Sequence, residues 1–67
     1  MSEFSIGDRV RIVGNVDQDY LDDYSGVTGI VDYVHPEPDT TYGQGYIINL
    51  DSGVLLDFYE VEVEKVD

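Results

Sequence analysis

Acidic side chains are the groups of this chain best suited to chemistry, and four of them gather in the segment 16–25. These are Asp17, Asp19, Asp22 and Asp23. Carboxylate oxygens are hard ligands that suit calcium, and the segment begins with the Asp-x-Asp spacing of an EF-hand loop. The spacing then departs from that loop, because Leu21 takes the fifth position, no glycine takes the sixth, and Thr28 stands where the bidentate glutamate belongs. We therefore expect a solvated acidic loop without a bound metal.

Catalytic groups are scarce in the chain. It has one histidine, His35, no cysteine, and serines only at positions 2, 5, 25 and 52. His35 precedes a proline at the end of a predicted strand, where an exposed or locally hydrogen-bonded side chain is expected. A nucleophile, a base and an orienting group cannot be assembled from this set. An acid–base carboxylate pair needs one buried member with a raised pKa, and the pattern marks no such carboxylate. We expect neither catalytic residues nor a cofactor, so the chain is not predicted to be an enzyme.

The charge of the chain points to a kind of partner. Fifteen Asp and Glu face three Lys and Arg, which gives a formal net charge of -12. Such a chain is repelled by phosphates and anionic lipids and is attracted to basic protein surfaces. Solubility is the alternative purpose of the charge. We expect a protein partner with a basic surface, no direct binding of nucleic acid or membrane, and a monomer when the chain is alone.

The predicted partner-binding residues combine these acids with tyrosines, which are favoured at interfaces. They are Asp17, Asp19, Tyr20, Asp22, Asp23, Tyr24, Glu37, Asp39, Tyr42, Glu62 and Glu64. Glu62 and Glu64 flank Val63 in an alternating run and are expected to share the outer face of a strand. Tyr33 and Tyr46 are instead expected to cover the core while their hydroxyls reach water.

Alternation of apolar and polar residues predicts five short strands, at 9–13, 26–35, 46–51, 54–58 and 61–66. Asp51-Ser52-Gly53 predicts a tight hairpin turn, and residues 57–60 fit one 3-10 turn. Residues 39–45 contain two glycines and predict a mobile loop tip. The prediction is an all-β fold in which residues 1–67 form a single domain, a five-stranded antiparallel barrel with one short 3-10 turn before the last strand.

The alternation also assigns faces to the strands. Val10 and Ile12 are predicted to point inward, while Arg9 and Arg11 share the outer face. Three residues of the third strand are predicted inward: Tyr46, Ile48 and Leu50. In the second strand Val31 and Tyr33 share one face and Ile30, Asp32 and Val34 share the other, unless a bulge exchanges them.

The order of motifs resembles the SH3-like barrels of the KOW-like kind. It comprises Gly7-Asp8-Arg9-Val10-Arg11-Ile12, then Gly26-x-x-Gly29-x-Val31, then Leu50-Asp51-x-Gly53, then Phe58-Tyr59-Glu60 and the run 62–66. The chain is similar to the photosystem I reaction-centre subunit four family, to ferredoxin-thioredoxin reductase variable chains and to small uncharacterised phage barrels. The resemblance implies the barrel and a rigid scaffold whose loops touch a larger protein.

Three functions are therefore expected, in this order. The first is a non-enzymatic acidic module that docks a basic surface of a partner protein, in its sharpest form a phage-type inhibitor that mimics nucleic acid. The second, implied by the resemblance, is a constitutive accessory subunit of a photosynthetic electron-transfer complex or a phage particle. The third is a KOW-like nucleic-acid-associated protein. The chain has no apolar run of about 20 residues and no signal-peptide pattern, which predicts a cytoplasmic location, or the host cytoplasm for a viral protein.

Overall fold

The computed structural model describes residues 4–14 and 24–66, and its regular elements are almost all strands. They are β1 (Arg9–Ile12), β2 (Thr28–Val34), β3 (Gly45–Leu50), β4 (Leu55–Tyr59), the 3-10 turn η1 (Glu60–Glu62) and β5 (Val63–Lys65). The strands form one five-stranded sheet in the order β4-β3-β2-β1-β5, and all neighbours are antiparallel. The all-β class, the antiparallel sheet and a 3-10 turn before the last strand are thereby confirmed. Within the described ranges no helix has the length and apolar character needed to cross a membrane.

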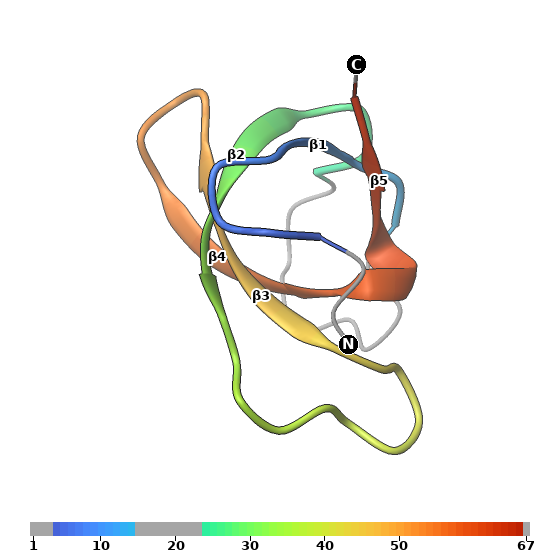
Figure 1. The fold of residues 1–67 in the computed structure, drawn as a ribbon. Coiled ribbons are helices and arrows are strands. Elements are labelled where there is room, and N and C mark those ends of the chain that lie inside the picture. Colours follow the sequence, from blue (N-terminus) through green and yellow to red (C-terminus); the bar gives the residue numbers. More distant parts are fainter. Residues whose placement is uncertain (1–3, 15–23, 67) are drawn as a thin grey trace.

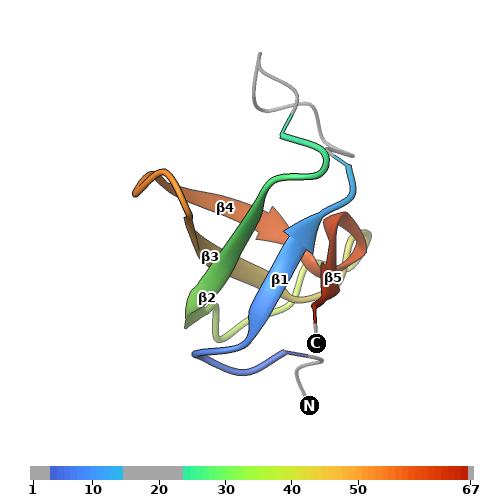
Figure 2. The ribbon, with the colours of Figure 1, turned by 90° about the horizontal axis from the view of Figure 1, so that it is seen from above.

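The sheet is strongly curved around its core (Figures 1 and 2). Figure 2 shows β2, β1 and β5 side by side, with β3 and β4 crossing behind them at a steep angle. Gly29 lies where β2 and β3 meet closely, since a Cβ atom there would lie 2.6 Å from the backbone oxygen of Asn49. No side chain fits at that distance, so glycine is required where the sheet bends.

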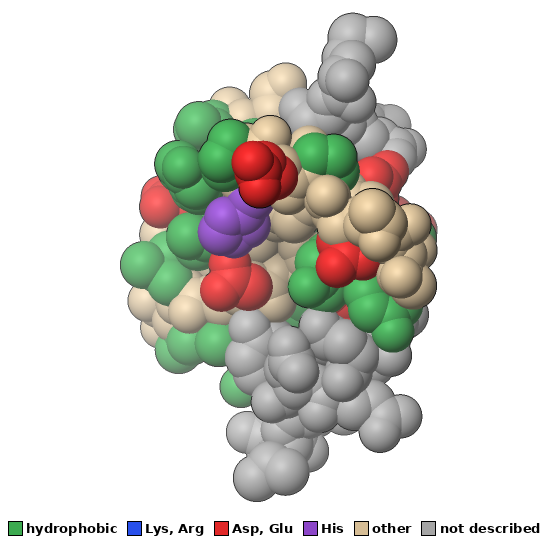
Figure 3. Space-filling view, turned by 90° about the horizontal axis from the view of Figure 1, so that it is seen from below, with side chains coloured by type: hydrophobic (Ala, Val, Ile, Leu, Met, Phe, Trp, Pro, Cys, Tyr) green, Lys and Arg blue, Asp and Glu red, His purple; other side chains and the backbone are tan. Residues whose placement is uncertain are grey.

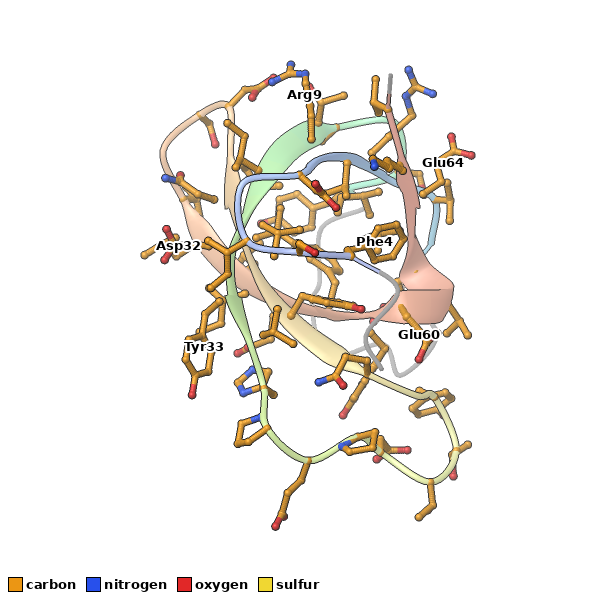
Figure 4. The ribbon with its side chains drawn as sticks, viewed as in Figure 1. Phe4, Arg9, Asp32, Tyr33, Glu60 and Glu64 are labelled. Atoms are coloured by element: carbon orange, nitrogen blue, oxygen red, sulfur yellow. The ribbon has the colours of Figure 1, made fainter. Side chains whose placement is uncertain are left out.

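The core lies inside this curve and is apolar. Its buried members are Phe4, Val10, Ile12, Val31, Tyr46, Ile48, Leu50, Phe58 and Val63. The predicted inward faces of β1 and β3 are confirmed, because every second residue of each strand is buried. Tyr46 is fully buried, and its hydroxyl accepts the backbone N–H of Phe4 at 3.1 Å, so the expectation that this hydroxyl reaches water is wrong. The ring of Phe4 meets that of Tyr46 edge to face at 5.4 Å (Figure 4).

The faces of β2 change along the strand because it contains a bulge. Pairing with β3 is regular from Gly29 to Val31 and then shifts register before Tyr33. Val31 is buried, Tyr33 is 45% exposed, and Val34 packs against the core. The expectation that Val31 and Tyr33 share a face is wrong, and the alternative with a bulge is the one observed. An extra residue in one strand reverses the alternation beyond it.

The end of the chain also differs from the prediction. The 3-10 turn covers Glu60–Glu62 instead of residues 57–60, and the last strand is shortened to Val63–Lys65. The hairpin between β3 and β4 lies where it was predicted, closed by the N–H of Gly53 donating to the carbonyl of Leu50 at 2.8 Å. The shift of the 3-10 turn decides which acidic side chains near the end of the chain can meet a partner.

Candidate functional site

The predicted partner-binding residues are divided by the structure into three groups. Asp17, Asp19, Tyr20, Asp22 and Asp23 lie outside the described residues. Tyr24, Glu62 and Glu64 lie on or beside the sheet, and each has a structural contact described below. Glu37, Asp39 and Tyr42 belong to the 35–44 loop between β2 and β3, which extends away from the sheet in Figure 1.

Glu62 is buried, with 1% of its surface exposed, so its predicted place on an outer face is wrong. Its Oε1 atom accepts the backbone N–H of Tyr59 at 2.7 Å and thereby closes η1. The reason is geometric, because a 3-10 turn has three residues per turn and breaks the two-residue period of the sequence. Val61 is consequently 52% exposed, while the acid beside it faces inward. Glu62 supports the fold and is not available to a partner.

Glu64 and the two arginines form ion pairs on the outer face of β1 and β5. Arg11 contacts Glu64 at 3.1 Å, and Arg9 contacts Asp51 at 3.0 Å, with all four side chains about half exposed. Figure 4 shows Arg9 and Glu64 at the same end of the molecule. The hydroxyl of Thr28 and, second, the guanidinium of Arg9 hold the pKa of Asp51 below its usual value. Both arginines of the chain are therefore already matched by carboxylates.

Tyr24 is half-buried and its ring packs edge to face against Phe58 at 6.3 Å. It belongs to the layer of partly buried residues around the core. Its main contact in the described structure is thus with the fold, and a partner would meet only part of the ring.

The 35–44 loop is fastened by a network of hydrogen bonds. Asp39 and Gly43 exchange backbone bonds at 2.8 and 3.0 Å, and Oδ1 of Asp39 accepts the N–H groups of Thr41 and Tyr42. The side-chain amide of Gln44 donates to the carbonyl of His35. These bonds define the shape of the loop, and the mobile tip expected from its two glycines stays a prediction. Asx-type bonds of this kind are a common role for aspartate in turns.

Gly43 and Glu60 tie the loop to the neighbouring end of β4. Gly43 has a φ of 84°, in the left-handed region, and a Cβ atom there would collide with the carboxylate of Glu60. That carboxylate accepts the N–H of Gln44 at 2.6 Å, and the N–H of Glu60 donates to the carbonyl of Gln44 at 2.8 Å. Glycine lets the carboxylate approach the loop backbone this closely. Glu60, labelled in Figure 4, is therefore another acid with a structural task.

An open hollow of about 440 Å³ lies between this loop and the end of β4. It is lined by His35, Pro36, Glu37, Pro38, Asp39, Gly45 and Tyr59. The ring of Tyr59 is backed by that of Tyr42 at 5.1 Å between centroids. Figure 3 shows the histidine side chain on this face with acidic side chains around it. The lining combines rings, prolines and carboxylates, so it offers both apolar contact and negative charge.

His35 forms the wall of the hollow beside the sheet. Its Nε2 atom lies 2.7 Å from Oδ1 of Asp57, and its ring meets that of Tyr33 edge to face at 5.4 Å. The expectation of an exposed or locally hydrogen-bonded histidine holds only for exposure, because the side chain is 38% exposed while its bonding partner lies on β4, far away in the sequence. A histidine bonded to an aspartate is also part of a nucleophilic triad, but the lining of the hollow supplies no serine, threonine or cysteine beside it. In the described ranges no group of three His, Cys, Asp or Glu residues is placed to hold a metal ion.

Sequence reasoning found Glu37, Asp39 and Tyr42 but missed their neighbours in the hollow. His35, Pro36, Pro38 and Tyr59 were assigned to strand ends and turns. The run His35-Pro36-Glu37-Pro38-Asp39 was the available signal, since two prolines around a glutamate make a stiff, exposed segment. The contribution of Tyr59, twenty residues further on, follows only from the way β4 returns along β3.

Comparison with known proteins supplies no template for this site. No protein-family model matches the chain. No curated protein and no solved structure matches it at a significant level.

Proposed function

We propose that the chain is a non-enzymatic protein-binding module that docks a basic surface of a partner protein. The observation that carries the proposal is the distribution of charge. The net charge is -12, and Arg9 and Arg11 are both paired with carboxylates at one end of the sheet. The face around the 35–44 loop instead gathers Glu37, Asp39 and Asp57 beside a single histidine. A partner rich in lysine and arginine is the natural complement of such a face.

The sharpest form of this proposal is an inhibitor of a nucleic-acid enzyme, of the kind that phages produce. An enzyme that binds DNA or RNA presents a basic groove to the phosphates. Carboxylates held on a rigid protein, with tyrosine rings between them, would occupy that groove in place of phosphates and bases. The 35–44 loop supports this form because hydrogen bonds within the chain hold the carboxylate of Asp39 in place, and that of Glu60 beside the loop. Such pre-organisation lowers the entropic cost of binding.

We further propose that the curved sheet is a five-stranded barrel of the SH3-like kind and that the chain is one domain. Three observations support the assignment: the strand order β4-β3-β2-β1-β5, the 3-10 turn just before β5, and the steep crossing of the two halves of the sheet (Figure 2). Closure between the edge strands β4 and β5 is the part of the assignment that remains a proposal.

Binding to partners in a lysate of the native source, at low and high salt, tests the docking proposal. The Debye length falls from about 10 Å at 0.1 M salt to about 3 Å at 1 M, so a partner held by charge is released. Glu37→Gln and Glu64→Gln make the same chemical change, one on the rim of the hollow and one on β5. We expect the chain to retain a basic protein at low salt and to release it at high salt. The Glu37→Gln variant should bind this protein more weakly than the Glu64→Gln variant does. A partner retained equally at both salt concentrations contradicts the proposal.

One observation favours a second function, that of an accessory subunit of a larger complex. The outer face of β2, β3 and β4 exposes apolar side chains, with Ile30 43%, Tyr33 45% and Leu55 54% exposed. Ile30 and Leu55 flank Asn49 in one row across the strands, and Tyr33 pairs with Ile47 in the next. Figure 4 shows Tyr33 projecting outward from the sheet. A patch of this kind suits a permanent subunit contact.

The accessory-subunit function makes the opposite prediction about salt. Binding through the outer face is expected to survive high salt, because burial of apolar surface is strengthened rather than screened by salts. Tyr33→Lys should then abolish binding, whereas Glu37→Gln should leave it unchanged. Weaker binding of Glu37→Gln together with normal binding of Tyr33→Lys would exclude this second function.

A further inference from the structure

We propose that the hollow beside the 35–44 loop receives an arginine side chain of the partner protein. The inference rests on the docking function proposed above and adds the site and the residue type that it recognises. The hollow is an open depression on the acidic loop face, about 440 Å³ in volume, between the loop and the end of β4. This volume lies in the range of small-molecule sites, so one long side chain and part of its backbone fit.

The walls of the hollow are held in place without a ligand. The N–H of His35 donates to the carbonyl of Gly45 at 3.0 Å, which closes the base of the loop. Gln44 joins both sides, because its side chain donates to the carbonyl of His35 and its N–H donates to Glu60 at 2.6 Å. A site already fixed in this way does not require ordering when a ligand enters.

The charges around the hollow select a cation. Glu37 and Asp39 line it directly, and Glu60 and Asp57 lie behind its walls. The two hydrogen bonds that the carboxylate of Asp39 accepts, from Thr41 and Tyr42, both reach Oδ1, so within the described residues Oδ2 is the oxygen that meets no donor. A carboxylate such as that of Asp39, held in place and only partly satisfied, favours a ligand that brings N–H donors and positive charge, and the exposed Glu37 adds a second negative charge.

The rings select arginine among the cations. Tyr59 lines the hollow and is backed by Tyr42, so its ring is held rather than free to turn away. A guanidinium is planar, stacks on an aromatic face and forms two parallel hydrogen bonds to a carboxylate, whereas an ammonium is a compact and strongly hydrated charge. Pro36 and Pro38 offer apolar surface to the aliphatic part of the side chain. A metal ion is a poorer occupant, because the described residues include no group of three ligands placed for one.

The first test uses short peptides as probes and amide NMR shifts of the full chain as the readout. The probes are acetyl-glycyl-arginyl-glycinamide and the same peptide with citrulline or lysine in place of arginine. Citrulline has nearly the shape of arginine and no charge. We expect the arginine peptide to bind with a Kd of the order of 1 mM and to shift His35, Gly45 and Tyr59. The citrulline peptide should bind at least about five-fold more weakly, as expected for loss of a cation–ring contact and an ion pair.

Each other result of the peptide titration overturns the inference. No shift at His35, Gly45 and Tyr59 with about 10 mM arginine peptide shows that the hollow is not the site. Equal binding of the citrulline peptide shows that charge is not recognised. Equal binding of the lysine peptide shows that a guanidinium is not specifically recognised.

Matched variants locate the contact and separate this inference from the docking function. Glu37→Gln should weaken binding of the arginine peptide about two- to five-fold, the range expected for loss of an exposed ion pair. Glu64→Gln should leave this binding unchanged. Tyr59→Phe keeps the ring and should bind normally, while Tyr59→Leu should bind more weakly. Suppose that a full-length basic partner is released by salt, but that neither Glu37→Gln nor Tyr59→Leu changes the affinity for the arginine peptide. That result would refute the arginine site and leave the docking function intact.

Discussion

Glu62 offers the sharpest test of the structure, because the sequence alone places this side chain in solvent and the fold places it inside. The perturbation is Glu62→Gln, and its control is Glu64→Gln two residues later. Glu62 is 1% exposed and accepts the N–H of Tyr59 at 2.7 Å, whereas the side chain of Glu64 is 51% exposed and pairs with Arg11. The two substitutions are chemically identical, so a difference between them reports the difference in environment.

The expected magnitude follows from the hydrogen bond. A bond to a charged acceptor contributes about 1.5–3 kcal/mol, and a neutral one about 0.5–1.5 kcal/mol. Glutamine keeps an oxygen for the N–H of Tyr59 but brings an amide that the site was not built to satisfy. Relief from the desolvation of a carboxylate offsets part of this loss. We expect Glu62→Gln to lower the free energy of unfolding by about 1–2 kcal/mol. Glu64→Gln should lower it by less than about 1 kcal/mol, the usual limit for an exposed ion pair.

Urea and thermal unfolding measure this difference. Tyrosine fluorescence is a suitable signal, since the chain has six tyrosines and no tryptophan. One kcal/mol corresponds to roughly 4–8 °C in Tm for a domain of this size. A Glu62→Gln variant that is as stable as Glu64→Gln would refute the buried position of Glu62, and with it the placement of η1.

Three further perturbations test other parts of the structure. Because Thr28 and Arg9 hold the pKa of Asp51 below its usual value, the bound carboxylate stabilises the fold above the unfolded pKa of about 3.9, and this contribution is lost as pH falls through the folded pKa. Asp51→Asn should therefore lower Tm at neutral pH and change it least in strong acid; an equal effect at both pH values contradicts the pairing. Gly43→Ala should lower the free energy of unfolding, measured in urea, by more than about 1 kcal/mol, because Gly43 has a φ of 84° and faces the carboxylate of Glu60. An unchanged urea midpoint would show that the loop contact is absent. Added salt should raise the Tm of the native chain by screening its net charge of -12, whereas a falling Tm would mean that the ion pairs outweigh the repulsion.

The strands were predictable wherever local alternation and core packing agree. Val10 and Ile12 alternate with arginines in β1, and Tyr46 and Ile48 alternate in β3, and all four are buried. An apolar residue at every second position needs no distant contact to reveal which face it occupies. The hairpin at 51–53 was predictable for a similar reason, because glycine marks the turn locally.

The alternation of apolar and polar residues predicts the wrong faces where a capping hydrogen bond or a bulge shifts its two-residue period. Residues 61–64 read Val-Glu-Val-Glu, which is an ideal strand pattern, yet Val61 is exposed and Glu62 is buried. The deciding interaction is the bond from Tyr59 to Glu62, which favours a 3-10 turn over one more pair of strand residues. The bulge in β2 has the same effect, since it leaves Tyr33 exposed although the alternation places it on the face of the buried Val31. A cap or a bulge leaves the residue types unchanged, so the alternation of apolar and polar residues does not reveal it.

The structure also changes what the acidity of the chain means. Glu62 closes a turn, Glu60 fastens a loop, and Asp51 and Glu64 neutralise the two arginines. These carboxylates contribute to the net charge but are already committed to contacts within the fold. Glu37 is different, because it is exposed on the rim of the hollow. Under the proposed docking function, total charge would set the long-range attraction to a basic partner, while recognition at close range would fall to the few acids that the fold leaves at the 35–44 loop.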